Sequence, residues 1–125
     1  MRLRGRKLKL PNYERAYVPF EKLQKYLLDE EHADGGNKAH FLRRIGFEIR
    51  DAHILTDQLL EISEREEVVR SVATSFGTKY VLDGLIRGPL GDARLRTVWF
   101  VTVDDLRPRL VTAYPISSIR RKPDD

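Results

Sequence analysis

The pattern of apolar and polar positions changes its period halfway along the chain. Up to about residue 66, apolar residues recur every three or four positions, as on the buried face of an amphipathic helix. Beyond that point they alternate with polar residues, as in strands that bury one face of a sheet. The pattern therefore predicts helices in the first half and strands in the second. The expected helices cover residues 20–29, 38–45 and 51–66.

The ends of these helices carry recognisable signals. Gly46 follows the second helix, in the position where a left-handed residue commonly ends a helix. Asp51 stands at the start of the third helix, where its carboxylate is placed to accept hydrogen bonds from the N–H groups of the first turn. The expected buried stripe of the third helix consists of Ala52, Leu55, Leu59 and Ile62.

Alternating segments in the second half predict four strands joined by short turns. Ser75-Phe76-Gly77 is a tight hairpin signal, and Gly88-Pro89-Leu90-Gly91-Asp92 marks a second turn. Short links between consecutive strands imply an antiparallel meander, and the helices are the only cover for one of its faces. We therefore expect an α+β fold, with the N-terminal helices on one face of the sheet and the other face partly open. The expected strands are residues 67–74, 77–86, 94–103 and 109–116.

The length of 125 residues fits one domain and leaves no room for a second core. The chain has no cysteine, which excludes disulfides, thiolate metal sites and cysteine nucleophiles. No apolar run is long enough for a signal peptide or a membrane span, and a cysteine-free chain suits the cytoplasm. We expect a cytoplasmic protein with no membrane partner and a single domain over residues 1–125, with an extended basic arm at 1–19 and a basic tail at 117–125.

The net charge of +4 is unevenly distributed. Residues 2–9 carry five basic groups and no acid, residues 61–67 are acidic, and residues 87–96 and 107–109 are basic. Clustered basic groups bind polyanions because they release counterions from the phosphate backbone. An ordinary solvated surface is the other interpretation, since a net charge of this size is modest.

Few residues form patterns that catalysis or metal binding requires. His40 and His53 lie inside expected helices, whereas His32 precedes a glycine-containing loop, where scaffolds often present functional groups. His32 with Asp34, or His53 with Asp57, offers at most two metal ligands, so we expect no metal and no cofactor. The chain also lacks a phosphate-binding loop and a serine nucleophile motif.

The expected sheet carries an unusual set of polar residues. Because alternate residues of a strand share a face, Thr97 and Trp99 lie on one face of the third strand and Arg96 on the other. Thr112 and Tyr114 share a face of the last strand. An amphipathic sheet with a wet polar face and a functional surface are both consistent with this pattern.

Five segments follow one another in a distinctive order along the chain. They are His32 to Phe41 (HxxGxxKAxF), Ile45-Gly46-Phe47, Phe76-Gly77-Thr78-Lys79-Tyr80 (FGTKY), Arg96-Thr97-Val98-Trp99 (RTVW) and Val111-Thr112-Ala113-Tyr114-Pro115 (VTAYP). Together they resemble the pattern of a family of small bacterial proteins of undefined function, over roughly residues 8–116. Relatives commonly have proline after the histidine of the first segment, where this chain has Ala33, so the loop that holds His32 is expected to be less rigid.

The order of elements in this family looks like that of the barnase–EndoU–colicin–RelE superfamily of ribonuclease toxins. The resemblance implies a metal-independent endoribonuclease toxin, one half of a toxin–antitoxin or toxin–immunity pair, which cleaves RNA by attack of the substrate's own 2′-hydroxyl. A histidine then acts as base or acid, cations hold the phosphate, and hydroxyls donate hydrogen bonds or position the ribose. The implied base or acid is His32. The implied phosphate-binding cations are Lys38, Lys79 and Arg96, and the implied hydroxyl groups are those of Thr97, Thr112 and Tyr114.

Two questions stay open at this level. The second acid–base residue is not evident, and Trp99 or Tyr80 is a candidate for stacking on a base, with a core position as the other interpretation of Trp99. The expected partners of an endoribonuclease toxin are an RNA substrate and a cognate antitoxin or immunity protein. The alternative function is a non-catalytic binding or accessory module, whose polar sheet face docks a protein or a nucleic acid.

Overall fold

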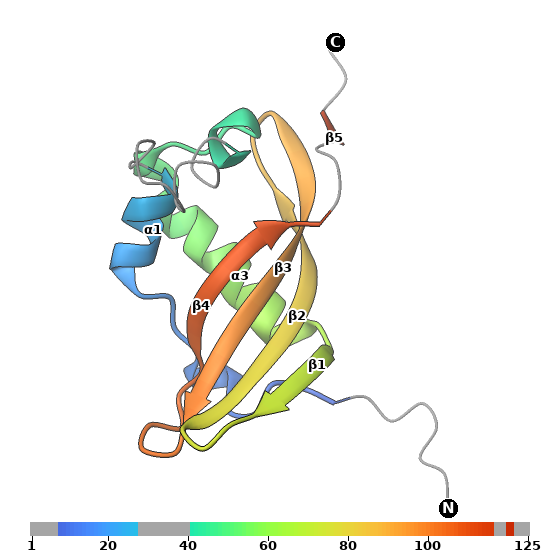
Figure 1. Ribbon diagram of the computed structural model, residues 1–125. Coiled ribbons are helices and arrows are strands. Elements are labelled where there is room, and N and C mark those ends of the chain that lie inside the picture. Colours follow the sequence, from blue (N-terminus) through green and yellow to red (C-terminus); the bar gives the residue numbers. More distant parts are fainter. Residues whose placement is uncertain (1–7, 28–40, 117–119, 122–125) are drawn as a thin grey trace, which may run out of the picture.

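The strands of the second half of the chain form an antiparallel sheet, and helix α3 lies across one face of it (Figure 1). The computed structural model describes residues 8–27, 41–116 and 120–121. The α+β class predicted from the sequence is confirmed. The named elements are η1 (Tyr13–Arg15), α1 (Phe20–Leu27), η2 (Ile49–Asp51), α3 (Ala52–Arg65), β1 (Val68–Ala73), β2 (Gly77–Arg87), β3 (Gly91–Thr102), β4 (Arg109–Pro115) and β5 (Arg120–Arg121).

The sheet is a meander, because its strands follow one another in the order β1-β2-β3-β4. β2 and β3 pair along their whole lengths, whereas β1 pairs only with residues 78–82 of β2. Beyond β1, the side chain of Gln58 in α3 takes the place of a neighbouring strand at Arg87. Its amide Nε2 donates to the carbonyl oxygen of Arg87 (2.8 Å), and its Oε1 accepts from the backbone N–H of Arg87 (2.7 Å). The short β5, which pairs with the start of β3, was not predicted.

Alternation along β3 decides which of its side chains reach the helices. Inward-pointing residues meet the apolar stripe of α3, of which Leu55, Leu59 and Ile62 are buried and Ala52 packs at the margin, as predicted. The outward-pointing residues between them are half-buried or exposed. The inward-pointing residues of β3 are Gly91, Ala93, Leu95, Thr97 and Trp99.

Trp99 is fully buried at the centre of this core. Its indole Nε1 donates to Thr97 Oγ1 (2.8 Å), and the Thr97 hydroxyl donates to the carbonyl oxygen of Leu82 (2.7 Å). The polar groups of both side chains are therefore satisfied inside the core. Trp99 is a core residue, and its ring is out of reach of a base.

The described part of the expected basic arm is not extended. Leu10 is buried in the core, and Lys9 Nζ donates to the carbonyl oxygens of Glu64 (3.0 Å) and Arg65 (2.7 Å) at the end of α3. A lysine in this place satisfies carbonyls that a helix leaves without partners at its C-terminus. Residues 8–19 therefore pack as part of the domain, because Leu10 is buried in the core and Tyr13, Ala16 and Val18 pack against it.

The helix ends agree with the sequence in one case and differ in another. Residues 41–44 are helical, and Gly46 follows with a φ of 101°, as predicted for the end of the second helix. Asp51 does not cap α3, because the short helix η2 precedes α3. Instead, Asp51 Oδ2 accepts from the backbone N–H of Glu48 (2.9 Å) at the start of η2.

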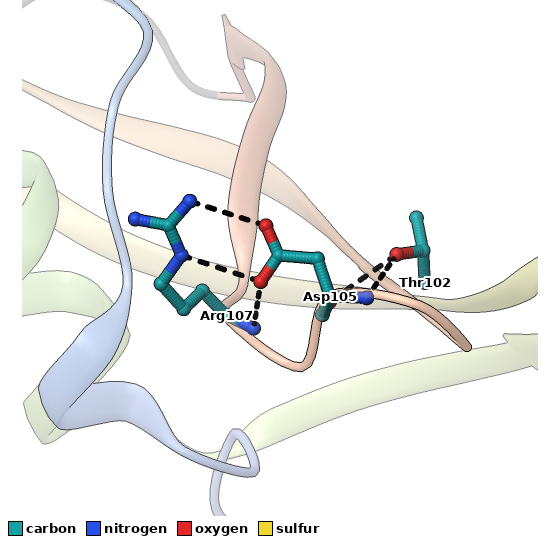
Figure 2. A network of polar contacts seen from close by, with 3 residues as sticks. All are labelled: Thr102, Asp105 and Arg107. Carbon is teal, nitrogen blue, oxygen red and sulfur yellow. Dashed lines mark hydrogen bonds and ion pairs between the residues drawn. The ribbon is translucent and has the colours of Figure 1, made fainter.

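A polar network fixes the turn between β3 and β4 (Figure 2). Thr102 Oγ1 accepts from the backbone N–H of Asp105 (2.9 Å), and the Asp105 carboxylate accepts from the backbone N–H (3.1 Å), Nε and Nη2 (both 3.2 Å) of Arg107. The guanidinium of Arg107 also lies over the ring of Tyr17, 4.7 Å from its centroid. The network thus joins the turn to the segment before α1.

This network is expected to make the protein less stable at acid pH. Hydrogen bonds from the Arg107 side chain and backbone lower the pKa of the Asp105 carboxyl below its ordinary value of 3.8. The stabilisation is complete above the pKa of the unfolded chain and is lost as the pH falls through the lower folded pKa. We expect the advantage in melting temperature of the wild type over Asp105→Asn to shrink in that window. Thermal unfolding followed by circular dichroism checks this, and an advantage that stays constant down to about pH 2 contradicts it.

Candidate functional site

One face of the sheet points away from helix α3 (Figure 1). This face carries cations around a small apolar centre. We call this surface the open face. Its apolar centre consists of Val81, Val98 and Phe100, which are half-buried and do not belong to the core cluster. Antiparallel register places the outward residues of neighbouring strands side by side. The cations of the open face are Arg70 of β1, Lys79 and Arg87 of β2, Arg94 and Arg96 of β3, and Arg109 of β4.

One row across the open face combines an acid, a cation and a phenol. Asp83, Arg96 and Tyr114 are cross-strand neighbours on β2, β3 and β4. Arg96 Nε and Nη2 donate to Asp83 Oδ1 and Oδ2, both at 2.9 Å, so that the two planar groups meet in a fork. The Asp83 side chain is 11% exposed, and that of Arg96 is 37% exposed. The buried carboxylate therefore fixes the orientation of a guanidinium that solvent still reaches.

The neighbours of Arg96 in this row favour the charged form of its guanidinium. The hydrogen bond to Asp83 and the charge of Asp83 raise the pKa of the Arg96 guanidinium above its usual range, and hydrogen bonding with Tyr114 adds a smaller contribution. Partial burial acts in the opposite direction. Asp83 engages Nε and Nη2 of the guanidinium, and Tyr114 is a further hydrogen-bond neighbour of the same group. A fixed guanidinium beside an exposed phenol is suited to an anion such as a phosphodiester, whose oxygens match the planar N–H groups.

Four of the predicted site residues lie on the open face. Tyr114 and Thr112 are outward residues of β4, and Thr112 is opposite Val98, next to Arg96. Lys79 is further away, because the β3 residue opposite it lies four positions from Arg96, or about 13 Å along the strand. The structure therefore brings together Arg96, Thr112 and Tyr114 and leaves Lys79 at the margin.

Of the other three predicted site residues, the structure describes only Thr97. Thr97 lies on the helix-facing side of the sheet, fully buried, with its hydroxyl bonded to Trp99 and Leu82. The sheet therefore separates Thr97 from the open face. His32 and Lys38 lie outside the described residues.

Sequence reasoning missed two residues of the open face, and a signal existed for both. Asp83 and Arg96 lie the same number of residues before and after the turn at Pro89 and Leu90, so a tight hairpin there pairs them. Phe100 shares the outward face of β3 with Arg96 by alternation. The stacking candidates that the sequence suggests are Trp99 and Tyr80.

Two hollows of the described part of the chain lie away from the candidate site. A hollow of about 260 Å³ lies between α3 and β2, and another of about 680 Å³ lies between residues 43–51 and the β2–β3 turn. Neither is lined by Arg96 or Tyr114. Over the described ranges, no group of three or more His, Asp or Glu is placed to hold a metal ion, and no helix is long and apolar enough to cross a membrane.

Comparisons with known proteins place the chain in a family and show one related fold. The model of the family described as "Domain of unknown function (DUF6883)" matches residues 9–117. A search of curated proteins gave no match. Among solved structures, a chain of a "Contact-dependent growth inhibition toxin - immunity protein complex from Klebsiella pneumoniae 342" is similar, with a TM-score of 0.68 and 16% sequence identity. The similarity covers 85% of this chain and 97% of that chain, and at this identity it is a similarity of fold.

Proposed function

The chain belongs to the DUF6883 family, a domain of unknown function, and we propose that it is a metal-independent endoribonuclease toxin. The observation that carries the proposal is the Arg96 guanidinium, held by Asp83 beside Tyr114 on the open face. The similar fold in a toxin–immunity complex supports a toxin or immunity-type role, with a cognate immunity protein or antitoxin as partner. The sequence resemblance supports RNA as the substrate.

The proposed reaction requires little more than positioned acids, bases and cations. The 2′-hydroxyl of the RNA attacks the adjacent phosphorus, a base takes its proton, the bond to the 5′-oxygen breaks, and an acid protonates that oxygen. Arg96 stabilises the negative charge that develops on the non-bridging oxygens. The Tyr114 hydroxyl, which is on a residue 39% exposed, donates to the same phosphate, and Thr112 positions the ribose. His32 is the proposed base or acid, and Lys38 a further phosphate ligand, as the resemblance implies.

The apolar centre of the open face favours a second candidate function, a non-catalytic binding module. Val81, Val98 and Phe100 lie among charged residues, as the centre of a protein interface lies inside a polar rim. Such a module binds a protein or a nucleic acid on the same face without changing it. The two candidates therefore differ in the fate of the RNA, not in where it binds.

Incubation of the purified protein with total cellular RNA and with tRNA in excess EDTA tests the proposal. We expect cleavage products with 2′,3′-cyclic phosphate ends, because the substrate's own hydroxyl is the nucleophile. RNA of the same sequence with 2′-O-methyl groups serves as the control and should remain intact. Intact RNA at high protein concentration favours the binding module, and cleavage that depends on added metal contradicts the metal-independent mechanism.

A further inference from the structure

Phe100 occupies a position on the open face that the proposed reaction does not use. In the antiparallel register its neighbours are Lys79 of β2 on one side and Arg109 of β4 on the other, and both cations are exposed. The ring is half-buried, yet it lies on the opposite side of the sheet from the buried core cluster. Phe100 is therefore an aromatic residue between two cations, and the hydrophobic core does not explain its presence there.

An aromatic ring between cations on a sheet surface matches the chemistry of an unpaired nucleotide. A base stacks on the ring, and the cations attract the phosphates on either side of it. The bases of a duplex are already stacked on one another, so a duplex offers this surface only its phosphates. The row of Lys79, Phe100 and Arg109 is therefore suited to distinguish single-stranded from double-stranded nucleic acid, which charge alone does not do.

The distance of this row from Arg96 limits how a nucleic-acid strand can lie on the open face. Phe100 lies four residues from Arg96 along β3, or about 13 Å, and Val98 lies between them on the same face. This distance is too long for both residues to contact one nucleotide. A base on Phe100 therefore belongs to a nucleotide further along the strand than the two nucleotides that the phosphate at Arg96 joins.

We propose that the open face binds an unpaired, single-stranded segment of RNA, with one base stacked on Phe100 and the flanking phosphates at Lys79 and Arg109. The choice of RNA rests on the proposed ribonuclease function, whereas the stacking itself requires no cleavage. The substrate class of the site is then an unpaired segment, such as a loop or a single-stranded end.

Fluorescence anisotropy with a labelled 2′-O-methyl RNA oligonucleotide tests the proposal, because this RNA binds without being cleaved. We expect the wild type to bind the single strand about tenfold more tightly than the same strand paired with its complement. Phe100→Leu should lose about tenfold in affinity for the single strand, and Phe100→Trp should retain the affinity because it keeps an aromatic face. Phe76→Leu is the matched control, since Phe76 is 75% exposed at the β1–β2 turn, and it should bind as the wild type does.

The salt dependence separates stacking from charge. Phe100→Leu should leave the slope of log affinity against log salt unchanged, whereas Lys79→Ala or Arg109→Ala should reduce it by about one. Equal binding of single strand and duplex, or wild-type affinity of Phe100→Leu, overturns the proposal. Tight, Phe100-dependent binding without cleavage of unmodified RNA refutes the ribonuclease and leaves this inference standing. Cleavage of unmodified RNA with no dependence on Phe100 supports the ribonuclease and overturns this inference.

Discussion

Replacement of Arg96 by alanine is expected to lower the rate of RNA cleavage by about 10²–10³-fold, the cost of removing one preorganised group that stabilises transition-state charge. The fold should persist, because the Arg96 side chain is partly exposed on the open face and outside the core. Single-turnover cleavage rates of the wild type and Arg96→Ala, with circular dichroism to confirm folding, measure the effect. Arg96→Lys should lose part of this rate, since an ammonium keeps the charge but not the fork with Asp83.

Two further variants isolate the role of Arg96 from the loss of an ion pair. Arg65→Ala removes an arginine that also pairs with a carboxylate, Glu61 (2.8 Å), but on α3 and away from the open face, and its cleavage rate should equal that of the wild type. The double variant with Asp83→Asn avoids leaving a poorly exposed carboxylate unpaired, and its rate should match that of Arg96→Ala. A single variant Arg96→Ala that cleaves within about twofold of the wild type would remove Arg96 from the mechanism.

Replacement of Trp99 by alanine is expected to lower the free energy of unfolding by about 3–5 kcal/mol, since it leaves a cavity in the core and removes a large buried ring. That loss is a large fraction of the roughly 5–15 kcal/mol that domains of this size possess. Thr97→Val should cost less, about 1–3 kcal/mol, because it leaves the Trp99 N–H and the Leu82 carbonyl without their partner.

Urea unfolding followed by circular dichroism measures these losses. Phe76→Ala is the control, because an aromatic residue 75% exposed should change the free energy of unfolding by no more than about 0.5 kcal/mol. A loss for Trp99→Ala no larger than that of the control would show that the ring does not support the core.

The success and the failures of the sequence analysis have separate physical causes. Alternation places Thr97 and Trp99 on one face of β3 and Arg96 on the other, because a strand has a period of two, but only the structure shows that the face of Thr97 and Trp99 meets the core. The burial of Leu10 was not predicted, because the leucines of the basic run form too short a pattern to show a period. The side chain of Asp51 was assigned to the first turn of α3 because Glu48, which begins η2 and forms a capping box with Asp51, is not one of the usual N-cap residues.

The candidate site was predictable in part for the same reasons. The pairing of Asp83 with Arg96 follows from the centre of one tight turn. The pairing of Arg96 with Tyr114 does not, because the register between β3 and β4 shifts between Val98 and Trp99. Such an irregularity adds one residue to one strand and depends on packing rather than on local sequence. The resemblance thus implied Tyr114 as a site residue, whereas only the structure shows that Tyr114 lies beside Arg96.

The amide of Gln58 has a consequence for the behaviour of the protein among other molecules. A strand without a neighbour offers its N–H and C=O groups to the strands of other proteins, and such pairing is a common route to aggregation. The helix side chain occupies both backbone groups of Arg87, at the end of a strand that β1 does not reach. Helix α3 thus covers the core with its apolar stripe, and its Gln58 protects that end of the sheet from pairing with another chain. This protection is expected to reduce self-association at high concentration.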